Sequence, residues 1–481
     1  MTTTAADRRI VIEPVTRVEG HGKVSILLDE DNKVKQARLH IVEFRGFERF
    51  IQGRLLWEVP VLVQRLCGIC PVSHHLAAAK AIDRIVGADQ LTPTAHKMRL
   101  LMHHGQFLQS HALHFFHLCS PDLLFGFDAD VGIRHVIGVA EAHRDLAVQG
   151  VMMRKYGQEI IKATAGKKIH GTGAIPGGIN KNLSIEERDG FLKDIDQMLQ
   201  WARGVVDIAK NYTVDNLDTV AGFGTFESNY LSLAAEDGSY EIYDGGLRAR
   251  TAEGDTIFDH VDNQVYDQHL QEEVRSWTYM KFPFIRSIGP ETDWYRVGPL
   301  ARVNNADRFT TPEAEQARQE FAALTEGKPC HVTLGYHWAR MIELLHSVEC
   351  IQQLLNDPDL QGTDLVVKGE RRHEAVGIIE APRGTLFHHY KIDEQDQVTM
   401  ANLIVSTTSN NEPMNRSVQK VAEDHLSGKT EITEGMLNHI EVAIRAYDPC
   451  LSCATHAMGQ MPLVVELYDD DGTLIDTRAK G

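Results

Sequence analysis

Two pairs of cysteines, each with two residues between its members, stand near opposite ends of the chain. The first pair is Cys67-Gly-Ile-Cys70 and the second is Cys450-Leu-Ser-Cys453. This spacing lets both sulfurs of a pair reach one metal ion, and two such pairs supply four thiolates. The pattern therefore predicts one four-sulfur metal site that joins the two ends of the sequence.

Structural zinc and a redox dithiol are the alternatives to a reactive metal site. Structural zinc usually joins cysteine pairs about 15–20 residues apart, because the ion organises a small domain. Here several hundred residues separate the pairs, and no βαβ pattern of the thioredoxin kind surrounds either one. Arg65 and His74 flank the first pair, and Asp448 and His456 flank the second. Protonatable neighbours favour a redox-active transition metal that works with proton transfer.

Short strands and long helices are expected to position these cysteines. Residues 9–42 read as a strand hairpin, with turn-forming residues at 29–32. Apolar residues recur at helical spacing over 92–119, 136–162, 192–212 and 336–356. Strands at 376–379 and 398–405 precede helices at 414–426 and 434–447, while 218–300 gives little signal. We predict an α+β fold, predominantly helical, with long central helices, N-terminal and peripheral β-hairpins, and both C-x-x-C motifs at one buried metal site.

Composition narrows the class of protein. The 481 residues include 49 Lys and Arg against 67 Asp and Glu, so the formal net charge is −18. Such an acidic chain is repelled by phosphate backbones and anionic lipid, which argues against nucleic-acid binding. No apolar run approaches the ~20 residues of a membrane span. Without a secretory signal, the odd number of seven cysteines does not indicate a disulfide framework.

Four longer segments resemble the signatures of the nickel–iron hydrogenase large subunit. They are Arg17-Val-Glu-Gly-His21, Arg65-Leu-Cys-Gly-Ile-Cys-Pro-Val-Ser-His74, Glu380-Ala-Pro-Arg-Gly384 and Asp448-Pro-Cys-Leu-Ser-Cys-Ala-Thr-His456. They follow one another in the family's order and span essentially the whole chain. Three further segments are most similar to the cytoplasmic, NAD-reducing bidirectional branch: Glu43-Phe-Arg-Gly-Phe-Glu48, Tyr279-Met-Lys-Phe-Pro283 and Ala457-Met-Gly-Gln-Met-Pro462.

The resemblance implies a nickel–iron centre held by all four cysteines. By motif position Cys67 and Cys450 would be terminal nickel ligands, whereas Cys70 and Cys453 would bridge nickel to an iron that carries CO and CN. Thiolate donation makes the nickel electron-rich, so that dihydrogen is split heterolytically. Thr407 aligns with a hydroxyl residue that bonds one cyanide; otherwise it is an ordinary threonine at a strand end.

Catalytic roles also follow from the resemblance. Glu19 matches the proton-relay glutamate; the alternative is a surface glutamate at a strand end. Arg383 matches the arginine that lies over the open coordination position of the metal centre. Its guanidinium group is planar and permanently charged, which suits polarising a small substrate. Pro382 would fix the local backbone, and Asp448 and Asp122 would orient Arg383.

A second cation, usually Mg²⁺, is implied below the active site. Its ligands would be Glu48, the carbonyl group of Leu403 and His456, since magnesium prefers oxygen ligands and water. His74 reads as a hydrogen-bonding neighbour of bridging Cys70. Packing is the expected role of the other cysteines and of the histidines on the helix 92–119, which are Cys119, Cys330, Cys350, His103, His104, His111, His114 and His117.

The function that the resemblance implies is reversible cleavage of H₂ to protons and electrons. Electrons would pass to a small subunit with an iron–sulfur cluster, then to diaphorase subunits with flavin, and then to NAD. Residues 1–456 would form one interwoven unit, and 457–481 a propeptide that a maturation protease removes after nickel-insertion factors load the metal. The alternatives are a hydrogen sensor and a non-catalytic electron-transfer subunit of the same fold; retention of all four cysteines argues against the latter.

Overall fold

The N-terminal segment forms the predicted antiparallel sheet. The computed structural model describes residues 8–287, 289, 291–292, 294–455, 463–468 and 474–480. Strands β1 (Arg8–Ile12), β2 (Gly22–Leu28) and β3 (Val34–Ile41) pair in this order. Every second residue of β2 is buried, as alternation along a strand requires. Asp29 closes the β2–β3 turn by accepting hydrogen bonds from N–H groups two and four residues later, and Asn32 takes a left-handed backbone (φ 60°).

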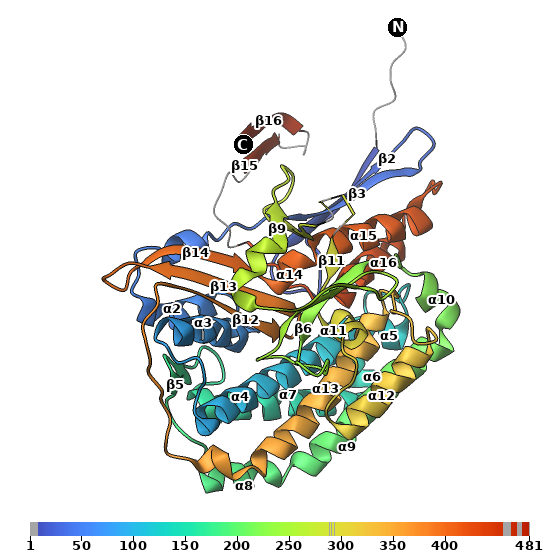
Figure 1. The fold of residues 1–481 in the computed structure, drawn as a ribbon. Helices are drawn as coiled ribbons and strands as arrows, with labels where there is room; N and C mark the ends of the chain where they lie inside the picture. Colours follow the sequence, from blue (N-terminus) through green and yellow to red (C-terminus); the bar gives the residue numbers. More distant parts are fainter. Residues whose placement is uncertain are drawn as a thin grey trace.

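Long helices form the body of the molecule, as predicted. In Figure 1, α4 (Pro93–Leu113), α7 (Arg144–Ala165), α9 (Ile195–Asp215) and α13 (Gly335–Leu355) lie side by side in the lower half. The hydroxyl group of Thr92 caps α4 by accepting a hydrogen bond from the third helical N–H group (3.1 Å). From its second turn on, α4 is buried nearly all round, so it is a core helix and not an amphipathic one.

Two predicted helices are interrupted. The helix expected over 92–119 ends as an α-helix at Leu113 and continues as the π-helical turn η3 (His114–Cys119) before α5 (Ser120–Phe125). The helix expected over 136–162 is divided at His143 into α6 (Val136–Ala142) and α7. The spacing of apolar residues does not show such breaks, because the segments before and after each break bury the same kind of residue.

A three-stranded antiparallel sheet packs on helix α3 (Pro71–Ile85), which begins directly after the first cysteine pair. Its strands are β12 (Glu374–Ala381), β13 (Gly384–Ile392) and β14 (Val398–Ile404). Gly377 lets β12 approach α3 closely, because a Cβ atom there would lie 2.2 Å from the carbonyl oxygen of Ala77. The sheet is thereby fixed next to the cysteine loop.

Pro382 and Arg383 form the turn between β12 and β13. Ala381 pairs with Gly384 across the turn, so only these two residues project beyond the sheet. Gly384 has a φ of 134°, and a Cβ atom there would lie 2.4 Å from the side chain of Val297. The motif seen in the sequence is therefore a tight hairpin tip that presents one arginine.

The segment that the sequence left unassigned contains several short strands. Strands β6 (Asn229–Ala234), β7 (Gly246–Arg250), β8 (Thr256–Val261) and β11 (Tyr295–Arg296) form one sheet. Strands β9 (Leu270–Glu273) and β10 (Phe282–Ile285) form another. These strands are short, and the pairing of β7 with β8 contains register shifts. They therefore leave no clear alternation of apolar and polar residues in the sequence.

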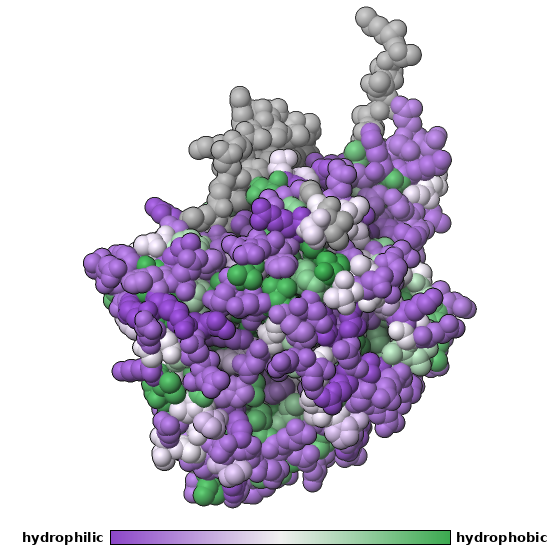
Figure 2. Space-filling view, in the orientation of Figure 1, coloured by the Kyte–Doolittle hydropathy of each residue, from purple (hydrophilic) through white to green (hydrophobic). Residues whose placement is uncertain are grey.

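Helices α15 (Asn411–Leu426) and α16 (Glu434–Ala446) lead to the second cysteine pair, as expected. Beyond it, β15 (Leu463–Tyr468) and β16 (Leu474–Lys480) form a two-stranded sheet of their own. Hydrophilic residues cover most of the face in Figure 2, which agrees with the charge of −18. None of the described helices combines the length and the apolar character that crossing a membrane requires.

Candidate metal centre

All four cysteines of the two pairs meet at one buried point, which confirms the prediction. The Sγ atom of Cys450 lies 3.4 Å from that of Cys67 and 2.8 Å from that of Cys453. The Sγ atom of Cys70 lies 3.6 Å from that of Cys453 and 4.0 Å from that of Cys450. None of the four residues is more than 5% exposed. Four sulfur atoms this close can bind one or two soft metal ions.

The first pair is held by the end of one helix and the start of another. Cys67 follows a short 3₁₀ helix, and Cys70 is the N-cap residue of α3. Between them, the carbonyl oxygen of Ile69 accepts hydrogen bonds from the side-chain amides of Gln106 and Gln109 on α4 (2.9 and 2.8 Å). These two bonds fix the loop so that both sulfur atoms face the same space.

The second pair is held against the N-terminal segment. Glu19 and Cys450 form a parallel bridge, and the N–H group of Leu451 donates to the carbonyl oxygen of Glu19 (3.0 Å). The carboxylate of Glu19 accepts a further bond from the N–H group of Ser452 (3.1 Å). Burial raises the pKa of Glu19, and the nearby Cys67 raises it further. The predicted proton-relay residue therefore lies beside the sulfur cluster and has a carboxyl group that holds a proton more readily than usual.

The thiols differ in how easily they ionise. Burial raises the pKa of Cys450 and of Cys453 well above the usual range. Hydrogen bonds from the other thiols lower the pKa of Cys67 well below it. Four negative sulfur atoms in a dry space repel one another, so a bound cation is what allows all of them to be thiolates.

Arg383 reaches from the β12–β13 turn towards the cysteines. Its Nε atom donates to the carbonyl oxygen of Asp448 (2.6 Å) and its Nη2 atom to the carboxylate of the same residue (3.0 Å). Burial opposes the charge of Arg383, but Asp448 and the cysteines raise its pKa above the usual range. Its Nη1 atom is buried and has no hydrogen-bond partner among the described residues. One donor of the guanidinium group is therefore left for a bound group.

A cavity lies between this turn, α3 and the cysteines. Its polar wall includes Arg383 and Thr407, the latter in the short helix α14 (Ser406–Ser409) after β14. The Oγ1 atom of Thr407 accepts a hydrogen bond from the N–H group of Cys450 (2.9 Å), so its own proton is left to donate. The complete lining is Cys70, Ser73, His74, Ala381, Pro382, Arg383, Leu386, Val405, Ser406, Thr407 and Cys450.

Known proteins match this chain over nearly its whole length. The family model described as nickel-dependent hydrogenase matches residues 45–127 and 232–456, and one described as HoxL-like matches residues 9–44. The chain belongs to the nickel-dependent hydrogenase family. Among its relatives, the NAD-reducing hydrogenase HoxS subunit beta of Cupriavidus necator is 49% identical, covering 98% of this chain and 100% of that protein. An F420-non-reducing hydrogenase chain of Methanothermobacter thermautotrophicus is 41% identical, covering 97% and 99%.

Solved hydrogenase structures share the fold. A crystal structure of an NAD⁺-reducing [NiFe]-hydrogenase in the H₂-reduced state superposes with a TM-score of 0.92 at 57% identity. The superposition covers 94% of this chain and 100% of the solved chain. A Ni-Fe-Se hydrogenase from D. vulgaris Hildenborough superposes with a TM-score of 0.75 at 23% identity, also over 94% of this chain and 100% of its own. The predicted fold is thus confirmed as that of a hydrogenase large subunit.

Asp122 of this hydrogenase chain lies in a different contact network from the expected one. Its carboxylate accepts hydrogen bonds from Arg17 (2.6 Å), Arg445 (3.0 Å) and Asn438 (3.2 Å). In the described structure the carboxylate partner of Arg383 is Asp448. Asp122 therefore ties the N-terminal segment to α16, and it does not bond to Arg383 directly.

His74 contacts the second cysteine pair. Its Nε2 atom lies 3.4 Å from the Sγ atom of Cys453, and it lines the same cavity as Cys70, its predicted neighbour. Its Nδ1 atom lies 3.1 Å from Nε2 of His388, whose Nδ1 atom lies 2.6 Å from the hydroxyl group of Tyr390. The first turn of α3 points His74 towards the second cysteine pair, a direction that sequence adjacency to Cys70 does not give.

Two of the three residues predicted for a second cation lie together. Glu48 is buried, and its Oε1 atom accepts a hydrogen bond from the N–H group of Leu403 (2.8 Å). His456, the third, lies outside the described residues. The Mg²⁺ site therefore stays a prediction, with a buried carboxylate at the expected place.

Arg302 is a structural residue of the site that sequence reasoning missed. Its guanidinium group donates to Glu380 (2.7 Å) and to the carbonyl oxygens of Ala381 (2.9 Å) and Pro382 (3.0 Å). Glu343 on α13 holds the other edge of the same group (2.5 and 2.7 Å). Arg302 thus anchors the backbone that carries Arg383. An arginine inside a short helix gives no sequence signal of this role, because its partners lie far away along the chain.

The other histidines and cysteines behave mainly as packing residues. His111 pairs with Glu343 (3.0 Å), and His114 lies 2.7 Å from the carbonyl oxygen of Arg445. His114, Cys119 and His337 do come within 4.8 Å of one another. However, the positive charge of Arg340 acts on all three, which disfavours a cation there.

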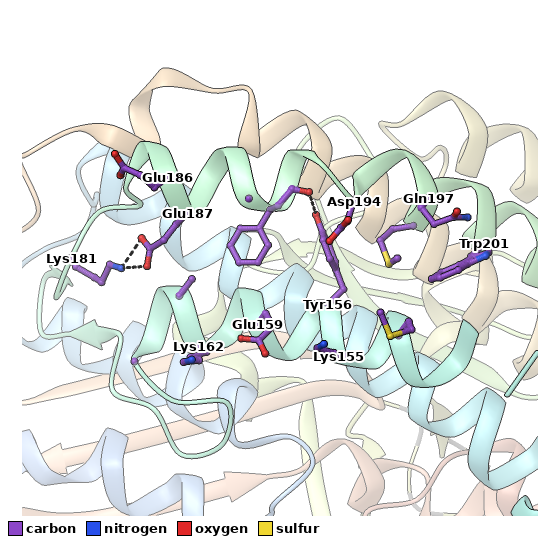
Figure 3. Close-up of a pocket in the computed structure, with 16 residues that line it drawn as sticks. Lys155, Tyr156, Glu159, Lys162, Lys181, Glu186, Glu187, Asp194, Gln197 and Trp201 are labelled. Carbon is purple, nitrogen blue, oxygen red and sulfur yellow. Dashed lines mark hydrogen bonds and ion pairs between the residues drawn. The ribbon is translucent and has the colours of Figure 1, made fainter. Parts of the chain in front are cut away.

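A groove of about 670 Å³ runs along α7, α8 (Ile185–Leu192) and α9, away from the cysteines (Figure 3). Lys181 and Glu187 face each other across one end (2.7 and 2.8 Å). No histidine or cysteine is among the residues that line it. The chemistry of this hydrogenase chain therefore centres on the four cysteines.

Proposed function

We propose that this chain is the catalytic subunit of a complex that cleaves H₂ reversibly and heterolytically and passes the electrons to NAD. The observation that carries the proposal is the meeting of four buried cysteine sulfurs beside a guanidinium group with an unpartnered donor. The relatives named as hydrogenases align with nearly the whole length of this chain. The name of the C. necator relative and the solved NAD⁺-reducing enzyme support NAD as the final acceptor.

The donor set fits a nickel–iron centre. All four cysteines, Cys67, Cys70, Cys450 and Cys453, would hold the metals through their thiolates. The Nη1 atom of Arg383 is buried beside a largely apolar cavity and has no partner among the described residues; this supports an iron with CO and CN ligands, because cyanide accepts hydrogen bonds. When bound, this centre polarises H₂ and takes up its electrons.

The protein's own groups then handle charge and protons. Arg383 keeps a fixed positive charge over the site, and Asp448 holds its direction. Glu19, close to Cys450, receives a proton and passes it outward. Glu48 and Leu403, with His456, would bind Mg²⁺ below the centre.

Electrons must leave through partner subunits. With four cysteines at the centre, three remain, and in the described structure Cys119, Cys330 and Cys350 do not gather into a common cluster site. Among the described residues, these three cysteines do not form a ligand set for a separate iron–sulfur cluster, which supports electron transfer to a partner subunit. We propose a cytoplasmic complex with a small iron–sulfur subunit and flavin-containing diaphorase subunits.

The proposal assigns H₂ cleavage to this chain and NAD reduction to its partner subunits, and this separation can be tested. The purified complex should reduce NAD with H₂, and the isolated, metal-loaded chain should not; adding the partner subunits should restore the reaction. H₂-dependent NADH formation, followed by its absorbance, measures this. NAD reduction by the chain alone would contradict the proposal. Very low H₂ oxidation by the complete complex with any dye would instead indicate a hydrogen sensor.

The tail after His456 is proposed as a propeptide removed during maturation. The nickel-dependent hydrogenase match ends at residue 456. The solved NAD⁺-reducing chain is covered in full yet spans 94% of this chain, and the tail is about 5% of it. In the described part of the chain, strands β15 and β16 form a separate two-stranded sheet. A specific protease would cut after the nickel-insertion factors have loaded the site.

We expect the large subunit of active enzyme to end at His456. While the tail continues beyond the second cysteine pair, it tethers the segment that must close over the metal, so cutting should follow loading. Intact-mass spectrometry of the purified, active complex measures the end of the chain. Fully active enzyme whose large subunit still carries 457–481 would show that the tail belongs to the mature protein.

A further inference from the structure

Ser73 has a fully buried hydroxyl group without a hydrogen-bond partner among the described residues. A buried serine inside a helix can donate to the carbonyl oxygen four residues earlier. For Ser73 that oxygen belongs to Ile69, and it already accepts bonds from Gln106 and Gln109. The loop that fixes the first cysteine pair therefore removes the local acceptor of Ser73.

The hydroxyl group belongs to the wall of the cavity beside the cysteines. The same cavity is lined by Arg383, whose Nη1 atom is also buried and unpartnered, and by Thr407, whose proton is free to donate. Much of the remaining wall is apolar, from Ala381, Pro382, Leu386 and Val405. Three donors around one small apolar space call for a group with several acceptor atoms, since a buried donor without a partner is costly.

We infer that the hydroxyl group of Ser73 donates a hydrogen bond to a cyanide ligand of the iron. This rests on the proposed nickel–iron centre. Cyanide carries negative charge on its nitrogen atom and is a strong acceptor, whereas the oxygen atom of carbon monoxide is a weak one. In the described structure the hydroxyl group of Ser73 forms no hydrogen bond to any of the four cysteine sulfurs, so a further acceptor is needed.

With this bond, three separate elements hold the iron ligands. Ser73 acts from the first turn of α3, Arg383 from the β12–β13 turn and Thr407 from α14. Ser73 lies three residues after Cys70, so one helix turn would supply both a sulfur atom and a donor. Ser73 is therefore a cofactor-binding residue that fixes the orientation of the iron with its diatomic ligands.

Infrared spectroscopy of the purified full complex tests the inference. Ser73→Ala should move one cyanide stretching band by more than its line width and leave the carbon monoxide band nearly in place. Ser73→Thr, which keeps the hydroxyl group, should keep the cyanide bands near the wild-type frequencies. Ser347→Ala is the matched control, because Ser347 on α13 is also a buried serine with an unpartnered hydroxyl group but does not line the cavity.

Each outcome decides between the two proposals. Wild-type complex without CO and CN bands would overturn the proposed centre itself. Wild-type bands that Ser73→Ala leaves unmoved, or a shift of the carbon monoxide band alone, would overturn only the role of Ser73. If Ser73→Ala does not load the metal, Ser73→Thr must load and show near wild-type bands; loss of the bands in both variants would also overturn it.

Discussion

Replacing Cys70 with alanine should remove nickel from the protein and abolish H₂ turnover. The Cys70 sulfur lies within 4.0 Å of two other sulfurs of the cluster and is proposed to bind both metals. The same loss is expected for Cys67, Cys450 and Cys453, because in the described structure no other cysteine joins the group. Metal analysis and H₂-dependent dye reduction of the purified complex measure both effects.

Cys119→Ala is the control for this prediction. Cys119 is equally buried, and burial keeps its thiol protonated by raising its pKa above the usual range. Its replacement deletes one small core group, which costs roughly 1 kcal/mol of stability and leaves nickel in place. Equal loss of activity in Cys119→Ala and Cys70→Ala, with nickel retained in both, would show that our division of the cysteines is incorrect.

Much of this site could be predicted because its residues stand in short motifs. The C-x-x-C spacing predicted shared metal binding, and the segment around Pro382 and Arg383 was identified by its resemblance to a family motif, whereas strand β13 after it was not predicted. The fold class followed from long stretches of helical periodicity. These signals are local, because each lies within one continuous segment of the sequence.

The rest depends on contacts between distant residues. Arg302 reaches its partners 41 to 80 positions away, and the bonds from Asp122 to Arg445 and from His74 to Cys453 span 323 and 379 positions. No local pattern encodes such a distance. The hydroxyl group of Ser73 is a clearer case still. It has no hydrogen-bond partner among the described residues, and no sequence pattern shows that a partner is missing.

Glu19→Gln should leave the metal centre assembled and lower H₂ turnover by about 10²–10⁴-fold, the usual contribution of a positioned acid–base group. Glutamine is nearly the same size, and its amide oxygen can still accept the bond from the N–H group of Ser452. It cannot take up a proton and release it. The backbone pairing of Glu19 with Cys450 and Leu451 is also unchanged, so nickel content and the infrared bands should stay as in the wild type.

Glu43→Gln is the matched control, because Glu43 also contacts Ser452, through the hydroxyl group (3.4 Å). Its carboxylate pairs with His21 (2.5 Å) and is about one-third exposed, whereas burial raises the pKa of Glu19. Of these two glutamates, Glu19 is the one that bridges to Cys450, so Glu43→Gln should keep most of the activity. Near wild-type turnover in Glu19→Gln with a full metal centre would refute the relay assignment. Loss of nickel from that variant would instead assign Glu19 a structural role, because its carboxylate would then be needed to close the second cysteine pair over the metal.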